Sequence, residues 1–515
     1  MPSCTAMSRI YLQAATIGGP VAFASITGKI APCPVRAACR VLQNGTFMTD
    51  LPASLAPVLE QADRTLEDAL ARLFAFLRIP SISTQPEHAA DCRQAAQWLR
   101  DELDSLGFDV TLHETPGHPI LVAHDRTPPA GPHVLFYGHY DVQPVDPLDL
   151  WTTAPFEPAL VTARDGRRQI TARGASDDKG QVMTFIEALR AIRATTGQMP
   201  VRITLLIEGE EECGGPSLLP FMEAHREELR ADVGLICDTA MLPGVPAITT
   251  TLRGMVGEEI HLRCASRDLH SGIYGNAARN PADVLCRVLS SLRDDATGRV
   301  TLPGFYAGVQ DPPEALRARW REIAPDDAAF LGDVGLSQPA GEKGYTAIEQ
   351  TWCRPSFEIN GISSGYTAEG FKTVLPGDAM AKVSFRLVAG QDPVHIRQAF
   401  CAHVREQLPP DCTVTFTPCG GSVASVVPDD TFGLRPALAV LGDEWGTPAV
   451  TIGCGGSIPV AADMQRILGM SALLVGFALD DDRVHSPNEK YDLTSFHKGI
   501  RSWIRILHAM GTTDA

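Results

Sequence analysis

Three apolar runs of strand type constrain the fold of this chain most strongly. They cover residues 133–137, 202–207 and 233–237, and a helical pattern over 180–195 separates the first from the second. Continuous apolar strands alternating with a helix indicate an α/β sheet that is covered on both faces. In an open sheet of this kind, ligands bind beyond the carboxyl ends of the strands. We therefore expect a binding site at that edge.

The residues that follow these runs are ligand types for divalent cations. His139 follows the first run, Glu211 and Glu212 follow the second, and Asp238 follows the third. Alone, His139 with Asp141 would be an ordinary surface or capping pair, and a group of acids after a strand is often a solvated turn. Three separate strands that end in such residues favour a common metal site instead.

Two further segments extend this pattern. Asp177 and Asp178 lie in the loop RGASDDKG, and His485 follows the strand-like run 471–477. A helix N-cap would explain one of the two aspartates but not both, and adjacent like charges repel unless a cation is present. One histidine and one acid per metal, with one shared acid, complete a two-metal hydrolase site. The five candidate ligands are His139, Asp177, Glu212, Asp238 and His485.

The chemistry of these ligands limits the choice of metal. Histidine and carboxylate ligands together suit zinc, manganese or cobalt, and no cysteine occupies a ligand position. We expect two divalent ions, with zinc favoured and manganese or cobalt as alternatives. Glu211, the spare acid beside Glu212, is placed to act as the base that activates water.

The pattern of helices and strands divides the chain into domains. Helical periodicity runs from Ala53 to Ile79 and again over 89–106, before the α/β texture begins. Alternating strands at 255–265 and 379–388, with helices at 281–293 and 393–407, then predict a ferredoxin-like α+β domain. We expect one α/β catalytic domain, residues 48–250 and 421–515, interrupted by an α+β domain over 251–420.

Composition excludes several classes of partner. The formal net charge of −17 disfavours nucleic acid and anionic membranes, and no stretch reaches the roughly 20 apolar residues of a membrane helix. The 13 cysteines are scattered without a CxxC pair, so they do not form a disulfide framework. A reducing cytoplasm is the expected location.

Residues 1–47 differ from the rest of the chain. They contain four basic residues and no acid. One interpretation is a disordered extension or a start codon called too early, with translation beginning at Met48. The other is an organellar transit peptide, which is also acid-poor and arginine-bearing. The first is favoured because no sustained amphipathic pattern is present.

From about residue 60 to its end, the chain resembles the co-catalytic zinc peptidase and deacylase family. The motifs that carry the resemblance are GHYDVQP, WTTAPFEP, RGASDDKGQ, EGEEECGG, DLHSGIYG, GFKTVLP, SFRLVAGQDP, GGSIPV and HSPNEKY. The resemblance implies that His139 and Asp238 bind one metal, that Glu212 and His485 bind the other, and that Asp177 bridges them. It also implies that Asp141 orients His139, that Glu211 is the general base, and that the peptide bond after Asp177 is cis.

The interrupting domain resembles the family's lid and dimerisation domain, in the carnosinase and dipeptidase branch. The motif DLHSG then implies that His270 reaches the site of a partner subunit in a homodimer, whereas without the resemblance it would be a capping or core histidine. Arg386 and Ser457 are expected to hold the free carboxylate of the substrate, with Gly456 allowing close approach of the backbone. The alternative for Arg386 is a solvated arginine on the wet face of the sheet.

The expected activity is hydrolysis of the amide bond of dipeptides or similar short substrates by a cytoplasmic dimer. Gly453 and Cys454 stand where the carnosinases carry a charged pair. An alternative within the same class is an N-acyl amino acid deacylase. An alternative from another class is a non-catalytic metal-binding protein on a dead hydrolase fold. That alternative predicts a lost ligand or base, and no such loss is present.

Overall fold

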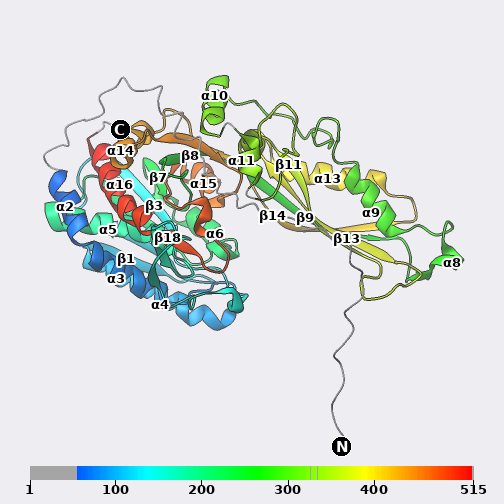
Figure 1. The fold of residues 1–515 in the computed structure, drawn as a ribbon, viewed down its shortest axis with the longest axis horizontal. Helices are drawn as coiled ribbons and strands as arrows, with labels where there is room; N and C mark the ends of the chain where they lie inside the picture. Colours follow the sequence, from blue (N-terminus) through cyan, green and yellow to red (C-terminus); the bar gives the residue numbers. More distant parts are fainter. Residues whose placement is uncertain (1–54, 325, 333, 513–515) are drawn as a thin grey trace, which may run out of the picture. The chain divides into compact units, whose positions relative to one another are not determined.

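The structure is a computed structural model that describes residues 55–512 except 325 and 333. Its largest sheet has nine strands in the order β1-β2-β6-β3-β7-β17-β8-β15, with β16 paired to β8. Figure 1 labels β1, β3, β7 and β8 of this sheet. Strands β3, β6 and β7 run parallel, as do β7 and β17, whereas β1 and β2 are antiparallel. The strands are β1 (Phe108–His113), β2 (Ile120–Asp125), β3 (His133–His139), β6 (Arg202–Glu208), β7 (Val233–Ile236), β8 (Ala247–Leu252), β15 (Ser425–Val426), β16 (Val450–Cys454) and β17 (Ala472–Leu474).

Helices cover both faces of this sheet. On one face Phe136 of β3 stacks on Phe185 of α5 (Lys179–Thr196) with 3.9 Å between ring centroids, and Trp503 of α16 (Leu493–Gly511) meets both rings edge-on. On the other face, Gly234 of β7 lies so close to Met464 that a Cβ would come within 2.8 Å of the Met464 sulfur. The expected covered α/β sheet is therefore confirmed. Helices α6 (Leu218–Ala224), α7 (Arg226–Leu229), α14 (Leu434–Trp445) and α15 (Pro459–Asp463) complete this part of the chain.

The first predicted helix is divided in two. The structure has α2 (Ala56–Arg64) and α3 (Leu66–Leu77), followed by α4 (Ala89–Ser105). The break lies at Thr65, whose hydroxyl donates to the carbonyl of Gln61 at 2.9 Å and whose backbone leaves the helical region. A threonine that bonds back to the preceding turn bends a helix. The prediction of one helix from Ala53 to Ile79 was wrong at this position.

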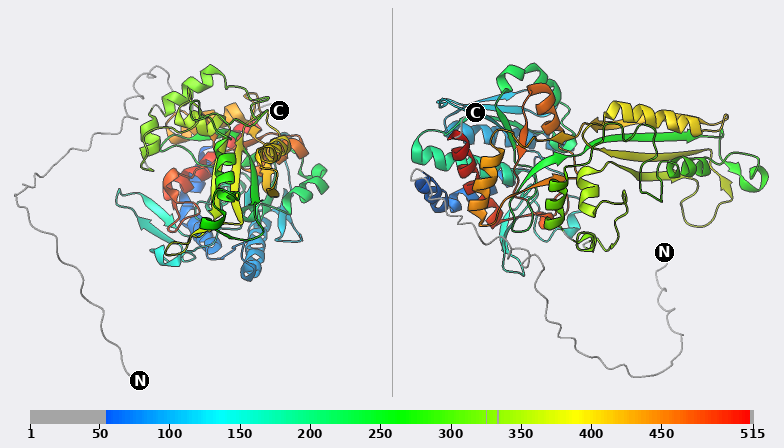
Figure 2. Two further views of the ribbon diagram at one scale, coloured as in Figure 1. Left: turned by 90° about the vertical axis from the view of Figure 1, so that its right-hand side faces the viewer. Right: turned by 90° about the horizontal axis from the view of Figure 1, so that it is seen from above.

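The interrupting segment forms the expected α+β domain. Its antiparallel sheet has the order β11-β13-β9-β14, with β9 (Gly254–Arg263), β11 (Ser356–Ser364), β13 (Asp378–Leu387) and β14 (Thr413–Ser422). Val383, Phe385 and Leu387 of β13 are buried in one core with side chains of α9 (Pro281–Ser290) and α13 (Pro393–Gln407). The right-hand view of Figure 2 shows α13, in yellow, lying along this sheet. Arg386 lies on the opposite face of the same strand, as its position in the alternation predicts.

Two hydrophobic cores match this organisation. One contains residues between 55 and 252 and between 427 and 510, and the other contains residues between 256 and 404. The domain boundaries at 250/251 and 420/421 remain predictions, and the N-terminal extension 1–47 lies outside the described residues. A smaller cluster surrounds Trp320, between α10 (Glu314–Ile323) and α12 (Ala347–Cys353). Helix α11 (Asp327–Gly332) lies between these two in sequence.

Two small sheets position loops of interest. Strands β4 (Ala159–Thr162), β5 (Arg168–Thr171) and β18 (Lys490–Asp492) form a sheet that joins the segment before Asp177 to the segment after His485. Strands β10 (Leu269–His270) and β12 (Val374–Leu375) pair beside α8 (Ser271–Tyr274). None of the helices built by the described residues is both long and apolar enough to cross a membrane.

Candidate metal centre

One group of potential ligands gathers where β3 and β7 end. His139 is the last residue of β3, and Asp238 lies two residues after β7. The Nε2 atom of His139 is 3.1 Å from Oδ1 of Asp177 and 4.0 Å from Oδ2 of Asp238. These three side chains can offer one ligand atom each to a single ion.

A second group shares Asp177 with the first. Nε2 of His485 is 2.9 Å from Oδ2 of Asp177 and 3.3 Å from Oε2 of Glu212. Glu212 lies in the 3₁₀ turn Glu211–Cys213 that follows β6. The two oxygens of Asp177 therefore face two different histidines, one in each group, and the structure brings together the five side chains singled out in the sequence.

The spacing of these atoms fits metal ions. Zinc ligands lie about 2.0–2.1 Å from the ion, so two ligand atoms of a tetrahedral site are about 3.3 Å apart. The four separations above run from 2.9 to 4.0 Å and bracket that value. The donor set of imidazoles and carboxylates suits zinc and also manganese or cobalt.

The electrostatics of the site also favour the binding of cations. Burial opposes protonation of His139, but Asp141 and Asp177 outweigh it and raise the pKa of His139 well above its ordinary value. Burial and the neighbouring carboxylates Asp177 and Asp178 raise the pKa of Asp238 well above its usual range. Without cations, the buried cluster has to take up protons, and divalent ions supply the same positive charge.

Asp141 and Asp178 both contact His139, the first at its Nδ1 atom and the second at its backbone N–H. Nδ1 of His139 is 3.1 Å from the backbone carbonyl oxygen of Asp141 and 3.3 Å from Oδ1 of the same residue, whose Oδ2 accepts the backbone N–H of Glu212 at 3.0 Å. Asp178 is the N-cap of α5, yet its side chain makes no capping bond and accepts the backbone N–H of His139 at 3.2 Å instead. A carbonyl or carboxylate oxygen at the second ring nitrogen fixes the orientation of a metal-binding histidine. The Asp177–Asp178 peptide bond is cis, as the resemblance implied.

Glu211 is a partly buried carboxylate next to Glu212 in sequence. Burial, followed by the charges of Asp177 and Glu212, raises its pKa to about 7, although His139 opposes the shift. A general base is most effective when its pKa lies near the working pH. Glu211 belongs to neither group of potential ligands.

Two supporting residues were missed in the sequence. Glu489 is fully buried and accepts the backbone N–H groups of Gly174, Ser176 and Asp177 and one N–H of Arg173, at 2.8–3.1 Å. Gln143 donates to Oε2 of Glu212 at 2.7 Å. Both residues lie within motifs already quoted, HSPNEKY and GHYDVQP, so their position in a motif was the available signal.

The site opens to solvent on one side. The side chain of His139 is fully buried, whereas that of His485 is 53% exposed. A cavity of about 360 Å³ is lined by Asp177 and Asp238 together with Ala478 and Arg483. A small substrate can therefore approach the ligands from this side.

The other site residues expected from the sequence, His270, Arg386, Gly456 and Ser457, lie in or near the α+β domain. His270 is exposed, and its Nδ1 accepts the backbone N–H of Gly272 at 3.0 Å. Arg386 is not merely solvated, since its Nη1 donates to the hydroxyl of Ser457 at 2.9 Å. Gly456 precedes that serine and donates its N–H to the sulfur of Cys454 at 3.3 Å. His270 therefore belongs to neither ligand group, and Arg386 and Ser457 form a pair of their own.

In hydrolases that use two metal ions, the ions lie close enough to share a ligand. Asp177 belongs to both groups of potential ligands, and this arrangement beside a covered α/β sheet is typical of dinuclear metallohydrolases. Within that class, the chain belongs to the peptidase family M20/M25/M40, whose model matches residues 135–509.

Relatives of known activity cover nearly the whole chain. The human Beta-Ala-His dipeptidase is 28% identical over 92% of this chain and 96% of its own length. The Cys-Gly metallodipeptidase of Candida albicans is 28% identical over 91% of this chain and 100% of its own. The crystal structure of human carnosine dipeptidase 1 superposes with a TM-score of 0.76 at 26% identity, covering 90% of this chain and 100% of that chain. A metallo-carboxypeptidase from Sulfolobus solfataricus gives a TM-score of 0.78 at 28% identity, covering 86% and 99%.

Proposed function

We propose that this chain is a dinuclear metallo-dipeptidase. The observation that carries the proposal is the placement of Asp177, whose two oxygens face His139 and His485 at 3.1 and 2.9 Å. Relatives named as dipeptidases, matched over about nine tenths of the chain, support a dipeptide substrate. The complete set of ligands and base argues against a non-catalytic protein on the same fold.

His139, Asp177 and Asp238 would hold one ion, and Asp177, Glu212 and His485 the other. Zinc is the metal that we favour, with manganese and cobalt as alternatives. When bound, such ions acidify water and polarise the amide carbonyl. The chain supplies the fixed geometry, because Asp141 orients His139 and Glu489 anchors the loop that carries Asp177.

Glu211 would move the proton. It would take a proton from water and return that proton to the leaving amine. It neighbours ligand Glu212 in sequence but belongs to neither ligand group. We therefore assign Glu211 as the general base.

Arg386, Ser457 and the backbone of Gly456 would hold the free carboxylate of the substrate. A guanidinium matches a carboxylate through two parallel hydrogen bonds, which a lysine cannot reproduce. The hydrogen bond from Arg386 to Ser457 at 2.9 Å holds the two side chains together for this purpose.

His270 would act on the site of a partner subunit in a homodimer. The ten residues of β9 span about 34 Å at about 3.4 Å per residue. Arg386 pairs with Met255 at the beginning of β9, whereas His270 comes seven residues after its end. Figure 1 shows α8, which follows His270, at the end of this sheet farther from β8. A histidine so far from Arg386 can contact the same substrate molecule only if it comes from the partner subunit of a dimer. There it would stabilise the oxyanion of the transition state.

We place the enzyme in the cytoplasm, with small peptides rather than nucleic acid or membranes as partners. The ten cysteines among the described residues are all free thiols, which suits a reducing compartment. The net charge of −17 disfavours polyanions.

Metal analysis and a substrate panel test this function. We expect two ions per chain after loading with zinc or manganese, loss of activity with chelator, and recovery when metal is returned. The panel contains free dipeptides, a tripeptide and N-acetyl amino acids, so that it separates a dipeptidase from a carboxypeptidase and a deacylase. One ion or none after loading would refute the dinuclear site. Faster cleavage of N-acetyl amino acids than of any dipeptide would favour the deacylase instead.

A further inference from the structure

Arg253, between β8 and β9, is a partly buried guanidinium group without a carboxylate partner. Its Nε donates to the carbonyl of Gly455 at 3.0 Å, and its Nη1 donates to the carbonyl of Arg354 at 3.3 Å. Within the part of the chain that the structure describes, no acid forms an ion pair with it. A guanidinium has five N–H donors, so several remain available. Removing a charge from water without a paired opposite charge is costly.

A second arginine, Arg386, is linked to Arg253 through the hydroxyl of Ser457. Arg386 donates to the hydroxyl of Ser457 at 2.9 Å, and that hydroxyl donates to the backbone carbonyl of Arg253 at 2.6 Å. Burial and then the charge of Arg386 lower the pKa of Arg253 to about 10. Two neighbouring cations of this kind repel each other, and a bound anion offsets the repulsion.

Arg253 makes two hydrogen bonds with the loop 455–457. Its side chain holds the carbonyl of Gly455, and its own carbonyl holds the hydroxyl of Ser457. A Cβ at position 455 would come within 3.0 Å of Nη2 of Arg253, so glycine allows the guanidinium to approach the loop closely. The side chain of Arg253 therefore holds Gly455, whereas Ser457 is held by a backbone carbonyl that any residue at position 253 would keep.

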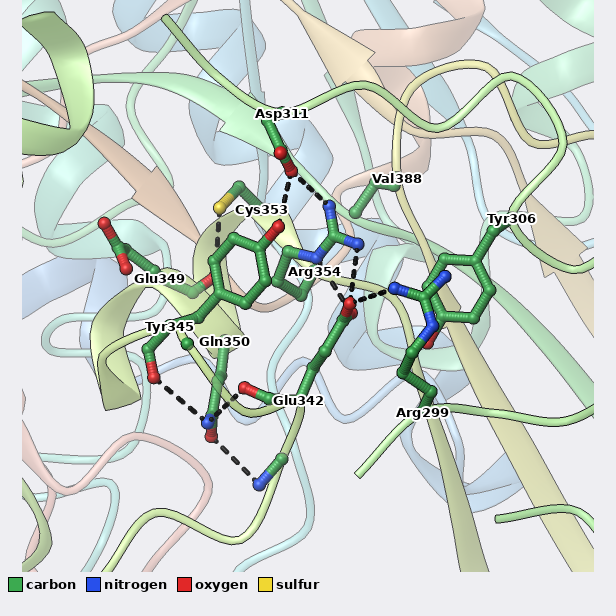
Figure 3. Close-up of polar contacts among 12 residues, drawn as sticks. Arg299, Tyr306, Asp311, Glu342, Tyr345, Glu349, Gln350, Cys353, Arg354 and Val388 are labelled. Atoms are coloured by element: carbon green, nitrogen blue, oxygen red, sulfur yellow. Dashed lines mark hydrogen bonds and ion pairs between the residues drawn. The ribbon is translucent and has the colours of Figure 1, made fainter. Parts of the chain in front are cut away.

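The backbone carbonyl that holds Arg253 is itself anchored. The side chain of Arg354 makes two hydrogen bonds to Glu342, at 2.9 and 3.1 Å, and one to Asp311 at 2.9 Å. Its guanidinium lies 4.5 Å from the ring centroid of Tyr345 and 5.8 Å from that of Tyr306 (Figure 3). A buried arginine with all these contacts fixes the start of β11, and through its carbonyl it fixes the direction of Arg253.

We propose that Arg253 is a second specificity-determining residue, which shares recognition of the substrate's carboxylate with Arg386. This inference rests on the proposed function. Arg253 lines two cavities, of about 240 and 380 Å³. The smaller one is also lined by Glu358 and by Ser356, whose backbone pairs with that of Arg386. Arg354 is a positioning residue that acts through Arg253. Two guanidinium groups on one carboxylate explain why Arg253 carries no acid of its own.

The test compares a free dipeptide with the same dipeptide amidated at its carboxyl end. A hydrogen bond to a charged group contributes about 1.5–3 kcal/mol, which corresponds to about 10- to 100-fold. Arg253→Gln should therefore lose about 10- to 100-fold in kcat/KM on the free dipeptide, mainly through KM. It should change less than about threefold on the amidated one. Arg253→Lys should fall between parent and Arg253→Gln, because it keeps the charge but loses the planar fork.

Two controls separate recognition from folding. Arg293→Gln removes another arginine that lines the 240 Å³ cavity and should leave the ratio between the two substrates unchanged. Metal content and Tm are measured for every variant. An equal loss on both substrates in Arg253→Gln and Arg253→Lys would overturn the proposal, because it would mean that Arg253 acts only on the fold. A parent enzyme that cleaves both substrates equally would instead overturn carboxylate recognition by Arg386 as well.

Discussion

Glu489→Gln should destabilise the protein and weaken its metal site together. The parent carboxylate accepts four N–H donors, two on each oxygen, and one of them belongs to the buried guanidinium of Arg173. Glutamine keeps one carbonyl oxygen but turns an NH₂ group toward two donors. Whichever way the amide lies, two donors lose their acceptor in a site that excludes water.

The magnitude follows from the burial of this pair. The side chains of Arg173 and Glu489 are 1% and 0% exposed and lie 2.8 Å apart. Removing one partner of a buried ion pair costs about 3–5 kcal/mol, since the other charge stays buried. At about 2–4 °C per kcal/mol, Tm should fall by about 6–20 °C. Burial raises the pKa of Glu489 to about 7, so the comparison is made at pH 8, where the carboxylate is ionised.

The assay is thermal unfolding in chelator, so that metal binding does not contribute to Tm. The matched control is Glu114→Gln, which removes a carboxylate from an exposed pair with Arg93 at 2.6 Å and should leave Tm essentially unchanged. Zinc titration should then show about 10- to 100-fold weaker binding in Glu489→Gln, because the loop of Asp177 has lost its anchor. Equal values of Tm for the two variants would refute the reasoning.

Three further outcomes are expected. Glu211→Gln should lower turnover by about 10²–10⁴-fold while metal content stays at the parent level, whereas Glu212→Gln should lower metal content; full turnover in Glu211→Gln would mean that another acid is the base. Mixed dimers of His270→Ala and Glu211→Gln subunits should regain activity, because one composite site is intact, and verified heterodimers without activity would exclude action across the dimer. Expression from Met48 should give an enzyme with unchanged activity and Tm, and a loss of folding would instead assign a role to residues 1–47.

Local patterns predicted the sheet and the residues at its edge. The runs that became β3, β6 and β7 are apolar throughout, and a strand of that kind has to be covered on both faces wherever it lies. Each run ends at residues whose placement depends only on the direction of the strand. His139, Glu212 and Asp238 could therefore be placed near one another before any contact was known.

Local sequence patterns could not predict contacts between residues that lie far apart in the sequence. His485 meets Asp177 across 308 residues of sequence, and only the family resemblance paired them in advance. The sheet β4-β5-β18, which brings Glu489 to the loop of Asp177, was not predicted because its strands are short. Arg253 has no distinctive neighbours in sequence, and its partners Arg354 and Gly455 lie 101 and 202 residues away. Such residues are recognised only once the backbone is in place.

The ten-residue length of β9 also constrains where insertions and deletions can occur in this chain. Val256, Ile260 and Leu262 face the core from this strand, and loss of a single residue would turn every side chain beyond the deletion to the opposite face. Loss of two residues would keep the faces but bring His270 about 7 Å closer to Arg253. Homologous chains that differ in length are therefore expected to carry their insertions and deletions in the loops around α10 and α11, and to keep β9 at a constant number of residues.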